Sequence, residues 1–142
     1  MKINISSDHA GFKLKKRVVN FLLKSHEVND LGPHSEESVD YPDFAHKLVN
    51  NLLDNDVSMG VLICGSANGI SMAANKHKNI RAAVCWNKEI AILAKQHNDA
   101  NVVSLPARFI TENEAIDIIE AFINTDFEGG RHLRRVNKIN CV

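Results

Sequence analysis

One cysteine stands where an apolar run gives way to a run of small residues. Gly60–Cys64 has the composition of a buried strand, and Ile70–Asn75 suits a helix. Between them lie only small or turn-forming residues: Gly65, Ser66, Ala67, Asn68 and Gly69. A loop that leads into a helix N-terminus can hold an anion on its backbone N–H groups and can lower the pKa of a nearby thiol. Cys64 is therefore a candidate nucleophile or base, and the alternative is a small buried apolar residue.

Histidines, arginines and a carboxylate elsewhere in the chain could complete such a site. Asp8 precedes His9 and could orient its imidazole. His97 stands at the end of a predicted helix, where the helix dipole favours an imidazolium. Arg131 and Arg135 are four residues apart, so on a helix they share a face and could clamp a phosphate. Each also has a purely structural explanation, but together they favour proton abstraction beside a carbonyl on a small phosphorylated metabolite.

Strand-like and helix-like segments alternate along the chain. Strands are predicted at Lys2–Ser6, Glu27–Leu31, Gly60–Cys64, Ile80–Cys85 and Val102–Leu105. Helices are predicted at Phe12–Leu23, Asp43–Leu53, Ile70–Asn75 and Lys88–Gln96, from the Thr111 capping box to Ile123, and at Arg131–Ile139. This alternation predicts a three-layer, Rossmann-like α/β fold with an open, parallel, five-stranded sheet, helices on both faces and a C-terminal tail helix. The weakly apolar Glu27–Leu31 is expected near an edge of the sheet.

Ligands of such folds bind beyond the carboxyl ends of the strands. Polar residues follow several of the predicted strands there: Asp8 and His9, Cys64 to Gly69, Asn87 and Arg108. We interpret them as one site. The small-residue loop matches neither the dinucleotide fingerprint nor a P-loop, which argues against a nucleotide-binding or regulatory module without catalysis.

Composition limits the remaining possibilities. The 142 residues form a single domain, 1–142, and 17 basic residues balance 17 acidic ones, which argues against nucleic-acid or membrane-surface partners. No apolar run is long enough to span a membrane, and Met1 leads directly into a strand, so we expect a cytoplasmic protein. Cys64, Cys85 and Cys141 form neither a disulfide framework nor a zinc pattern. We therefore expect all three to be free thiols.

Six separated motifs, in order over nearly the whole chain, resemble ribose-5-phosphate isomerase type B, a family that shares its scaffold with galactose-6-phosphate isomerase subunits. They are Ser-Asp-His-Ala-Gly-Phe (7–12), Asp-Tyr-Pro (40–42), Ile-Cys-Gly-Ser-Ala-Asn-Gly-Ile (63–70), Ala-Ala-Asn-Lys (73–76), Gln-His-Asn-Asp-Ala-Asn (96–101) and Glu-Gly-Gly-Arg-His (128–132). The resemblance implies an isomerase without metal or organic cofactor. It would interconvert ribose 5-phosphate and ribulose 5-phosphate through an enediolate, in the pentose phosphate pathway. The alternative is an isomerase of a six-carbon sugar phosphate, such as allose or galactose 6-phosphate.

The resemblance also implies a role for individual residues. Cys64 would be the base, the loop from Gly65 to Gly69 the anion hole, with Ser66 adding its hydroxyl, and His97 the acid that helps to open the furanose ring. The other implied substrate-binding residues are Asn98, then Asp8, His9 and Tyr41 around the sugar, and Arg108, Arg131 and Arg135 around the phosphate. Family members are dimers or tetramers with active sites at a subunit interface, so a homodimer or tetramer is expected.

Two positions depart from common family patterns. The loop reads Gly-Ser-Ala-Asn-Gly in place of Gly-Thr-Gly-Val-Gly, so Ser66 keeps the hydroxyl. Ala67 replaces a glycine and must adopt either a negative φ or a strained backbone. Another branch of the family uses a glutamate after the loop as its base, where this chain has Ile70. That difference leaves Cys64 as the candidate base.

Overall fold

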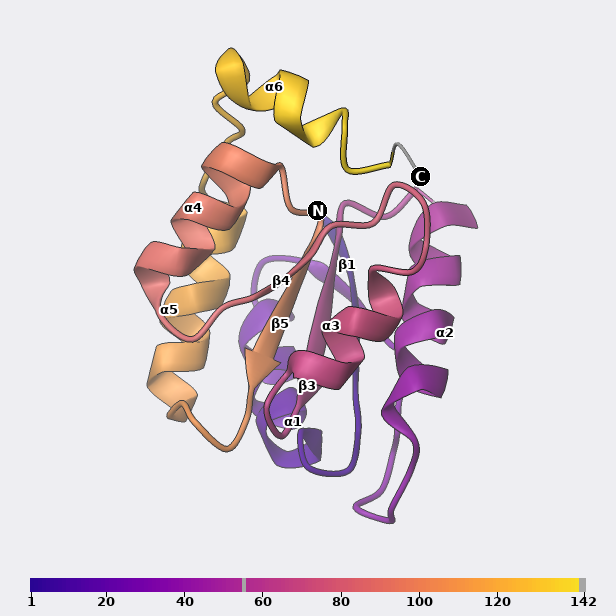
Figure 1. Cartoon of the computed structure of the whole chain (residues 1–142). Coiled ribbons are helices and arrows are strands. Elements are labelled where there is room, and N and C mark those ends of the chain that lie inside the picture. The colour runs from indigo at the N-terminus through magenta and orange to yellow at the C-terminus, as the bar shows by residue number, and fades with distance from the viewer. Residues whose placement is uncertain (55, 141–142) are drawn as a thin grey trace.

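A parallel, five-stranded sheet forms the middle of the molecule, and helices cover both of its faces (Figure 1). The computed structural model describes residues 1–54 and 56–140. The strands are β1 (Lys2–Ser7), β2 (Glu27–Asp30), β3 (Met59–Cys64), β4 (Ala82–Val84) and β5 (Val102–Pro106), in the order β2-β1-β3-β5-β4. The helices are α1 (Phe12–Leu22), α2 (Tyr41–Asp54), α3 (Asn68–Ala74), α4 (Lys88–Asn98), α5 (Glu112–Ile123) and α6 (Arg131–Val136). The predicted fold is confirmed, including the tail helix and the edge position of β2.

The two faces of β3 belong to two separate cores. All six residues of this central strand are buried. Val61 and Ile63 pack with the core under α1, α4 and α5, whereas Leu62 and Cys64 pack with residues of α2 and α3. Because side chains alternate along a strand, the apolar run fills both cores and leaves Cys64 at its carboxyl end on the α2–α3 face. Cys64 and Cys85 are buried free thiols, and Cys141 lies outside the described residues.

Two elements, β4 and α6, are three residues shorter than predicted. β4 pairs over three residues only. Arg81 N–H, just before it, donates to Asn101 Oδ1, and Ala82 N–H, at its first residue, donates to Asn75 Oδ1. The last helix ends at Val136, not at Ile139, because the chain then turns through tighter bonds between residues three apart. Asparagine side chains thus add to the backbone bonds at the start of β4.

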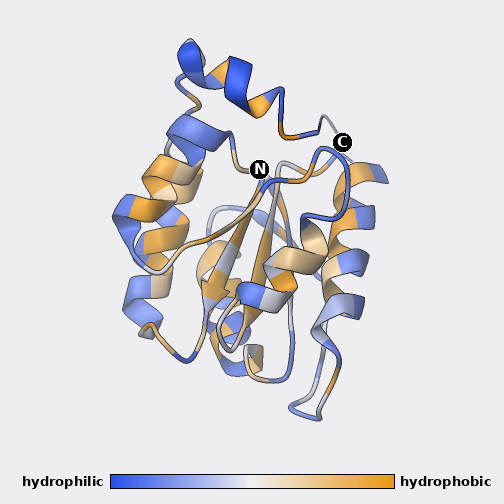
Figure 2. Ribbon diagram, in the orientation of Figure 1, coloured by the Kyte–Doolittle hydropathy of each residue, from blue (hydrophilic) through white to orange (hydrophobic). Residues whose placement is uncertain are grey.

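Hydropathy follows the layers of the fold (Figure 2). The strands and the inner faces of the helices are apolar, and α6 is largely hydrophilic. Among residues 1–54 and 56–140, no helix combines the length and apolarity that a membrane span requires.

Candidate active site

The loop after β3 surrounds the thiol of Cys64. Cys64 is 5% exposed, and the backbone N–H groups of Ile70, Ala67 and Ser66 lie on the side of the loop where they act to lower the pKa of its thiol. Two further backbone bonds hold the loop against the end of β5, from Ala107 N–H to Cys64 O (2.9 Å) and from Arg108 N–H to Gly65 O (3.1 Å). The predicted arrangement of strand, loop and helix N-terminus around one thiol is therefore present.

The pKa of Cys64 moves in the direction opposite to the one the loop alone predicts. Burial raises it above the ordinary value of 9.0, and the nearby Asp8 carboxylate raises it further. The three N–H groups lower it, as expected, but they do not outweigh the other two effects. Cys64 is thus a neutral thiol near pH 7 in the chain without ligand. The expectation of a lowered thiol pKa was wrong because it left out burial and Asp8.

Ala67 has a strained backbone. Its φ is 64° and its ψ is −7°, in the left-handed region, and its side chain is fully buried. This conformation costs a residue with a Cβ about 1–2 kcal/mol. Of the two outcomes open from the sequence, a negative φ or strain, the structure has the strained one.

Two glycines of the loop let side chains lie directly on it. A Cβ on Gly69 would come within 2.5 Å of Tyr41 Cζ, so the tyrosine ring packs against the bare backbone there. A Cβ on Gly65 would lie 3.3 Å from three atoms of the Arg108 guanidinium group. Tyr41 and Arg108 therefore lie beside the Cys64 loop, Arg108 as expected from its position after the fifth strand and Tyr41 as the resemblance implies.

Asp8 and His9 border the same loop. Asp8 is 7% exposed, its N–H donates to Ile63 O (3.0 Å), and its Oδ1 accepts from Gly11 N–H (2.9 Å) at the start of α1. The N–H of Val39, from the long segment between β2 and α2, donates to His9 Nδ1 (3.3 Å). Because Nδ1 accepts, the hydrogen of a neutral His9 is on Nε2, which leaves Nε2–H as a donor for a ligand.

The remaining predicted residues lie at the opposite end of the sheet, beyond the amino ends of the strands. A helix between parallel strands runs antiparallel to them, so the end of α4, with His97 and Asn98, lies near the strands' amino ends. Asn98 O accepts from Arg81 Nε (3.0 Å), just before β4. In Figure 1, α6, with Arg131 and Arg135, lies beyond the end of the sheet opposite to the arrowhead of β5. Within one chain, these residues and Cys64 do not share a site.

At that end of the sheet, His97 stacks on His132. The ring centroids are 4.2 Å apart and the planes differ by 7°, and His132 Nε2 lies 3.5 Å from Glu128 Oε2. Burial, and then His97 and Arg131, lower the pKa of His132 below its ordinary value, while Glu128 acts to raise it. The role of His132 and Glu128 in this arrangement was missed, because nothing local links positions 97 and 132.

These three side chains form the one group of potential metal ligands within the described parts of the chain, with ligand atoms within 4.8 Å of one another. The lone pair of an imidazole nitrogen lies in the plane of its ring. Because the two rings are parallel and stacked, both nitrogens cannot point at one ion unless a ring turns. As arranged, the group is a histidine stack with a carboxylate partner.

Known proteins that resemble the chain decide its family. A profile described as ribose/galactose isomerase matches residues 3–139. The chain belongs to this family. Ribose-5-phosphate isomerase B of Escherichia coli K12 is 41% identical over 142 residues, which are 99% of this chain and 95% of that protein. The isomerase class and the resemblance stated from the six motifs are confirmed.

Solved structures of family members agree over the whole chain. The crystal structure of a ribose 5-phosphate isomerase from Thermotoga maritima superposes with a TM-score of 0.97 at 51% identity, and covers 99% of this chain and 98% of that one. Ribose-5-phosphate isomerase B from Mycoplasma genitalium, with bound ribulose 5-phosphate, has a TM-score of 0.93 at 44% identity and covers 99% and 94%.

Proposed function

We propose that this family member interconverts D-ribose 5-phosphate and D-ribulose 5-phosphate, with Cys64 as the base. The observation that carries the proposal is the buried thiol at the end of β3, next to the loop whose backbone N–H groups favour its thiolate. The names of the E. coli, T. maritima and M. genitalium relatives support ribose 5-phosphate as the substrate. The M. genitalium structure, which contains bound ribulose 5-phosphate, supports the same assignment.

In the proposed reaction, the thiol of Cys64 first gives its proton to solvent, and the thiolate, the minor form near pH 7, removes the proton from C2 of the open-chain aldose. The electron pair forms a C1–C2 double bond, and the carbonyl oxygen O1 becomes the anion of an enediolate. The same thiol then returns the proton to C1, while O1 is protonated and the C2 hydroxyl loses its proton to become the ketone. N–H groups of the loop and the Ser66 hydroxyl stabilise the anionic oxygen because they are already oriented.

We place the Cys64 loop, Asp8, His9, Tyr41 and Arg108 around the sugar and one side of the phosphate. His97, Asn98, Arg131 and Arg135 would act from a second subunit, with His97 giving a proton to the ring oxygen. Their location at the opposite end of the sheet supports a homodimer or tetramer in which each site uses two chains. We place the reaction in the cytoplasm, where a buried thiol base stays reduced.

The test compares Cys64→Ala with Cys85→Ala on ribose 5-phosphate, allose 6-phosphate and galactose 6-phosphate, with and without a chelator. Cys85 is the matched control because it is buried in the core on the other face of the sheet. We expect turnover of ribose 5-phosphate that Cys64→Ala lowers by at least about 10²-fold, while Cys85→Ala keeps it. Full activity of Cys64→Ala would reject the role of Cys64 as the base. Faster turnover of a six-carbon sugar phosphate than of ribose 5-phosphate would mean that the six-carbon compound is the substrate.

A further inference from the structure

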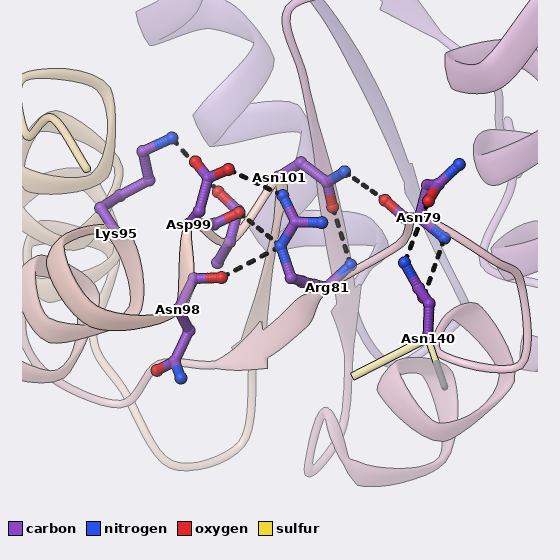
Figure 3. Close-up of polar contacts among 8 residues, drawn as sticks. Asn79, Arg81, Lys95, Asn98, Asp99, Asn101 and Asn140 are labelled. Carbon is purple, nitrogen blue, oxygen red and sulfur yellow. Dashed lines mark hydrogen bonds and ion pairs between the residues drawn. The ribbon is translucent and has the colours of Figure 1, made fainter. Parts of the chain in front are cut away.

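A guanidinium group closes the end of α4 (Figure 3). Arg81 stands just before β4, and its Nε donates to the carbonyl oxygens of Asn98 (3.0 Å) and Asp99 (2.8 Å). Its NH2 group donates to Asp99 Oδ2 (2.9 Å). The Arg81 side chain is only 18% exposed, so these charge-assisted bonds are partly shielded from water. The protein's own acceptors therefore engage the guanidinium along its Nε–Nη2 edge.

The last carbonyl groups of a helix have no partner within the helix, and they carry the negative end of its dipole. Arg81 supplies a partner and an opposite charge from a different element. Asp99 has a φ of 46°, so the chain leaves α4 through a left-handed residue that the ion pair holds in place. His97 and Asn98 directly precede this point. Their backbone direction depends on how firmly the helix end is held.

Packing alone does not hold these two side chains. Asn98 is exposed and lines a cavity of about 500 Å³, together with Arg81 and Asn140. His97 is half-buried and has the stacked His132 ring on one face. With open space beside Asn98, the bonds from Arg81 add to two backbone bonds that close the helix end, from Asp99 N–H to Lys95 O (3.1 Å) and from Ala100 N–H to Ala94 O (3.0 Å).

The same cluster reaches the tail that follows α6. Arg81 N–H donates to Asn101 Oδ1 (2.8 Å), and Asn101 Nδ2 donates to Asn79 O (2.8 Å). Asn79 and Asn140 exchange two bonds, of 3.3 Å and 3.0 Å. The end of α4 and the tail after α6 are thus tied to one point at the edge of the sheet, and these two helices carry the proposed ring-opening and phosphate residues.

We propose that Arg81 is a positioning residue for ring opening, which acts on His97 and Asn98 through the carbonyl groups of Asn98 and Asp99. The inference rests on the proposed role of His97. Ring closure follows formation of the aldehyde, so exchange of the C1 hydrogen of ribulose 5-phosphate with solvent needs Cys64 but not the ring step. The ratio of C1 exchange to net formation of ribose 5-phosphate therefore reports the ring step alone.

The experiment measures both rates in D₂O, at saturating ribulose 5-phosphate, by NMR. In Arg81→Met we expect net formation to fall about 10- to 100-fold, the range for a catalytic group displaced by about 1 Å, with little change in C1 exchange. Arg81→Lys keeps the charge beside Asp99 and should recover part of the loss. Arg17→Met is the control, since Arg17 makes an exposed ion pair with Glu112 (3.4 Å) and should behave as the wild type.

Equal losses in both rates, or no change in either, would overturn the positioning role. If Arg81→Met does not fold, Arg81→Lys tests the same proposal. In this variant the ratio of C1 exchange to net formation of ribose 5-phosphate should rise by less than in Arg81→Met, and an unchanged ratio would reject the proposal. Failure of the proposed function looks different, because the wild type would then show neither exchange nor net formation. An unchanged ratio in His97→Asn would reject the role of His97 itself.

Discussion

At the residue scale, Cys64 is placed between opposing effects. Burial and the Asp8 carboxylate keep its proton on, and three loop N–H groups favour the thiolate. Because burial and Asp8 outweigh the N–H groups, Cys64 is a neutral thiol in the chain without substrate. A base needs the thiolate, so the charge at Asp8 influences both the resting state and the reactivity of Cys64.

Asp8→Asn tests this electrostatic coupling. The amide oxygen of asparagine can still accept from Gly11 N–H (2.9 Å in the parent), but the negative charge is gone, so the pKa of Cys64 should fall. The measurement is the rate of alkylation of the Cys64 peptide by iodoacetamide against pH, read by mass spectrometry. We expect the midpoint at a lower pH than in the wild type, and no shift in the exposed control Asp56→Asn. A midpoint that stays or rises would show that Asp8 is not the source.

Cys85 makes a separate prediction about alkaline stability. Burial raises its pKa from 9.0 to about 12. The folded state keeps the thiol proton of Cys85 at pH values where the unfolded state has lost it. The contribution of Cys85 to the free energy of unfolding is therefore full below pH 9 and is lost as the pH rises toward 12. The free energy of unfolding should fall by about 1.4 kcal/mol per pH unit in this window from this residue. Urea unfolding at a series of pH values, at fixed protein concentration, gives the free energy of unfolding as a function of pH. Between pH 9 and 12 this free energy should fall less steeply in Cys85→Ala than in the wild type, and an equally steep fall would contradict the assignment.

At the element scale, local patterns predicted β3, the loop and α3 well, because apolar runs, small residues and helix formers each act within a few positions. Other features depend on contacts between distant segments. The His97–His132 stack joins positions far apart in the chain, and the asparagines at the start of β4 act through their side chains. His97 was grouped with Cys64 by its residue type and then by the resemblance, since the sequence around a helix end does not show at which end of the sheet that residue lies.

Ala67→Gly tests the strain in the loop between β3 and α3. Glycine adopts a φ of 64° without penalty but gains entropy when unfolded, so the net stabilisation should be about 0.5–1 kcal/mol. The matched control is Ala73→Gly, which lies in the right-handed body of α3 and should destabilise by about 1 kcal/mol. Urea unfolding of both variants gives the comparison. If Ala67→Gly destabilises as much as the control, the loop stores no strain at this position.

At the scale of the whole molecule, the proposed catalytic residues divide into two sets, which lie at opposite ends of the strands of one sheet. The Cys64 loop lies at the carboxyl ends of the strands, and the end of α4 and α6 lie beyond the amino ends. A sheet of this kind is rigid, so no local motion of one chain brings the two sets together. Two chains that meet edge to edge would form complete sites from unlike halves.

Complementation between two inactive variants tests this arrangement. With cyclic ribose 5-phosphate as the substrate, Cys64→Ala and His97→Asn should each be nearly inactive alone, because every site of either oligomer lacks one group. After unfolding and refolding together in equal amounts, a site is complete only if its Cys64 comes from the second variant and its His97 from the first, which gives about a quarter of wild-type activity by random assembly. Mixing two preparations of Cys64→Ala is the control and should give none. If native mass spectrometry shows mixed oligomers and activity still does not return, Cys64 and His97 do not act in one site built from two chains.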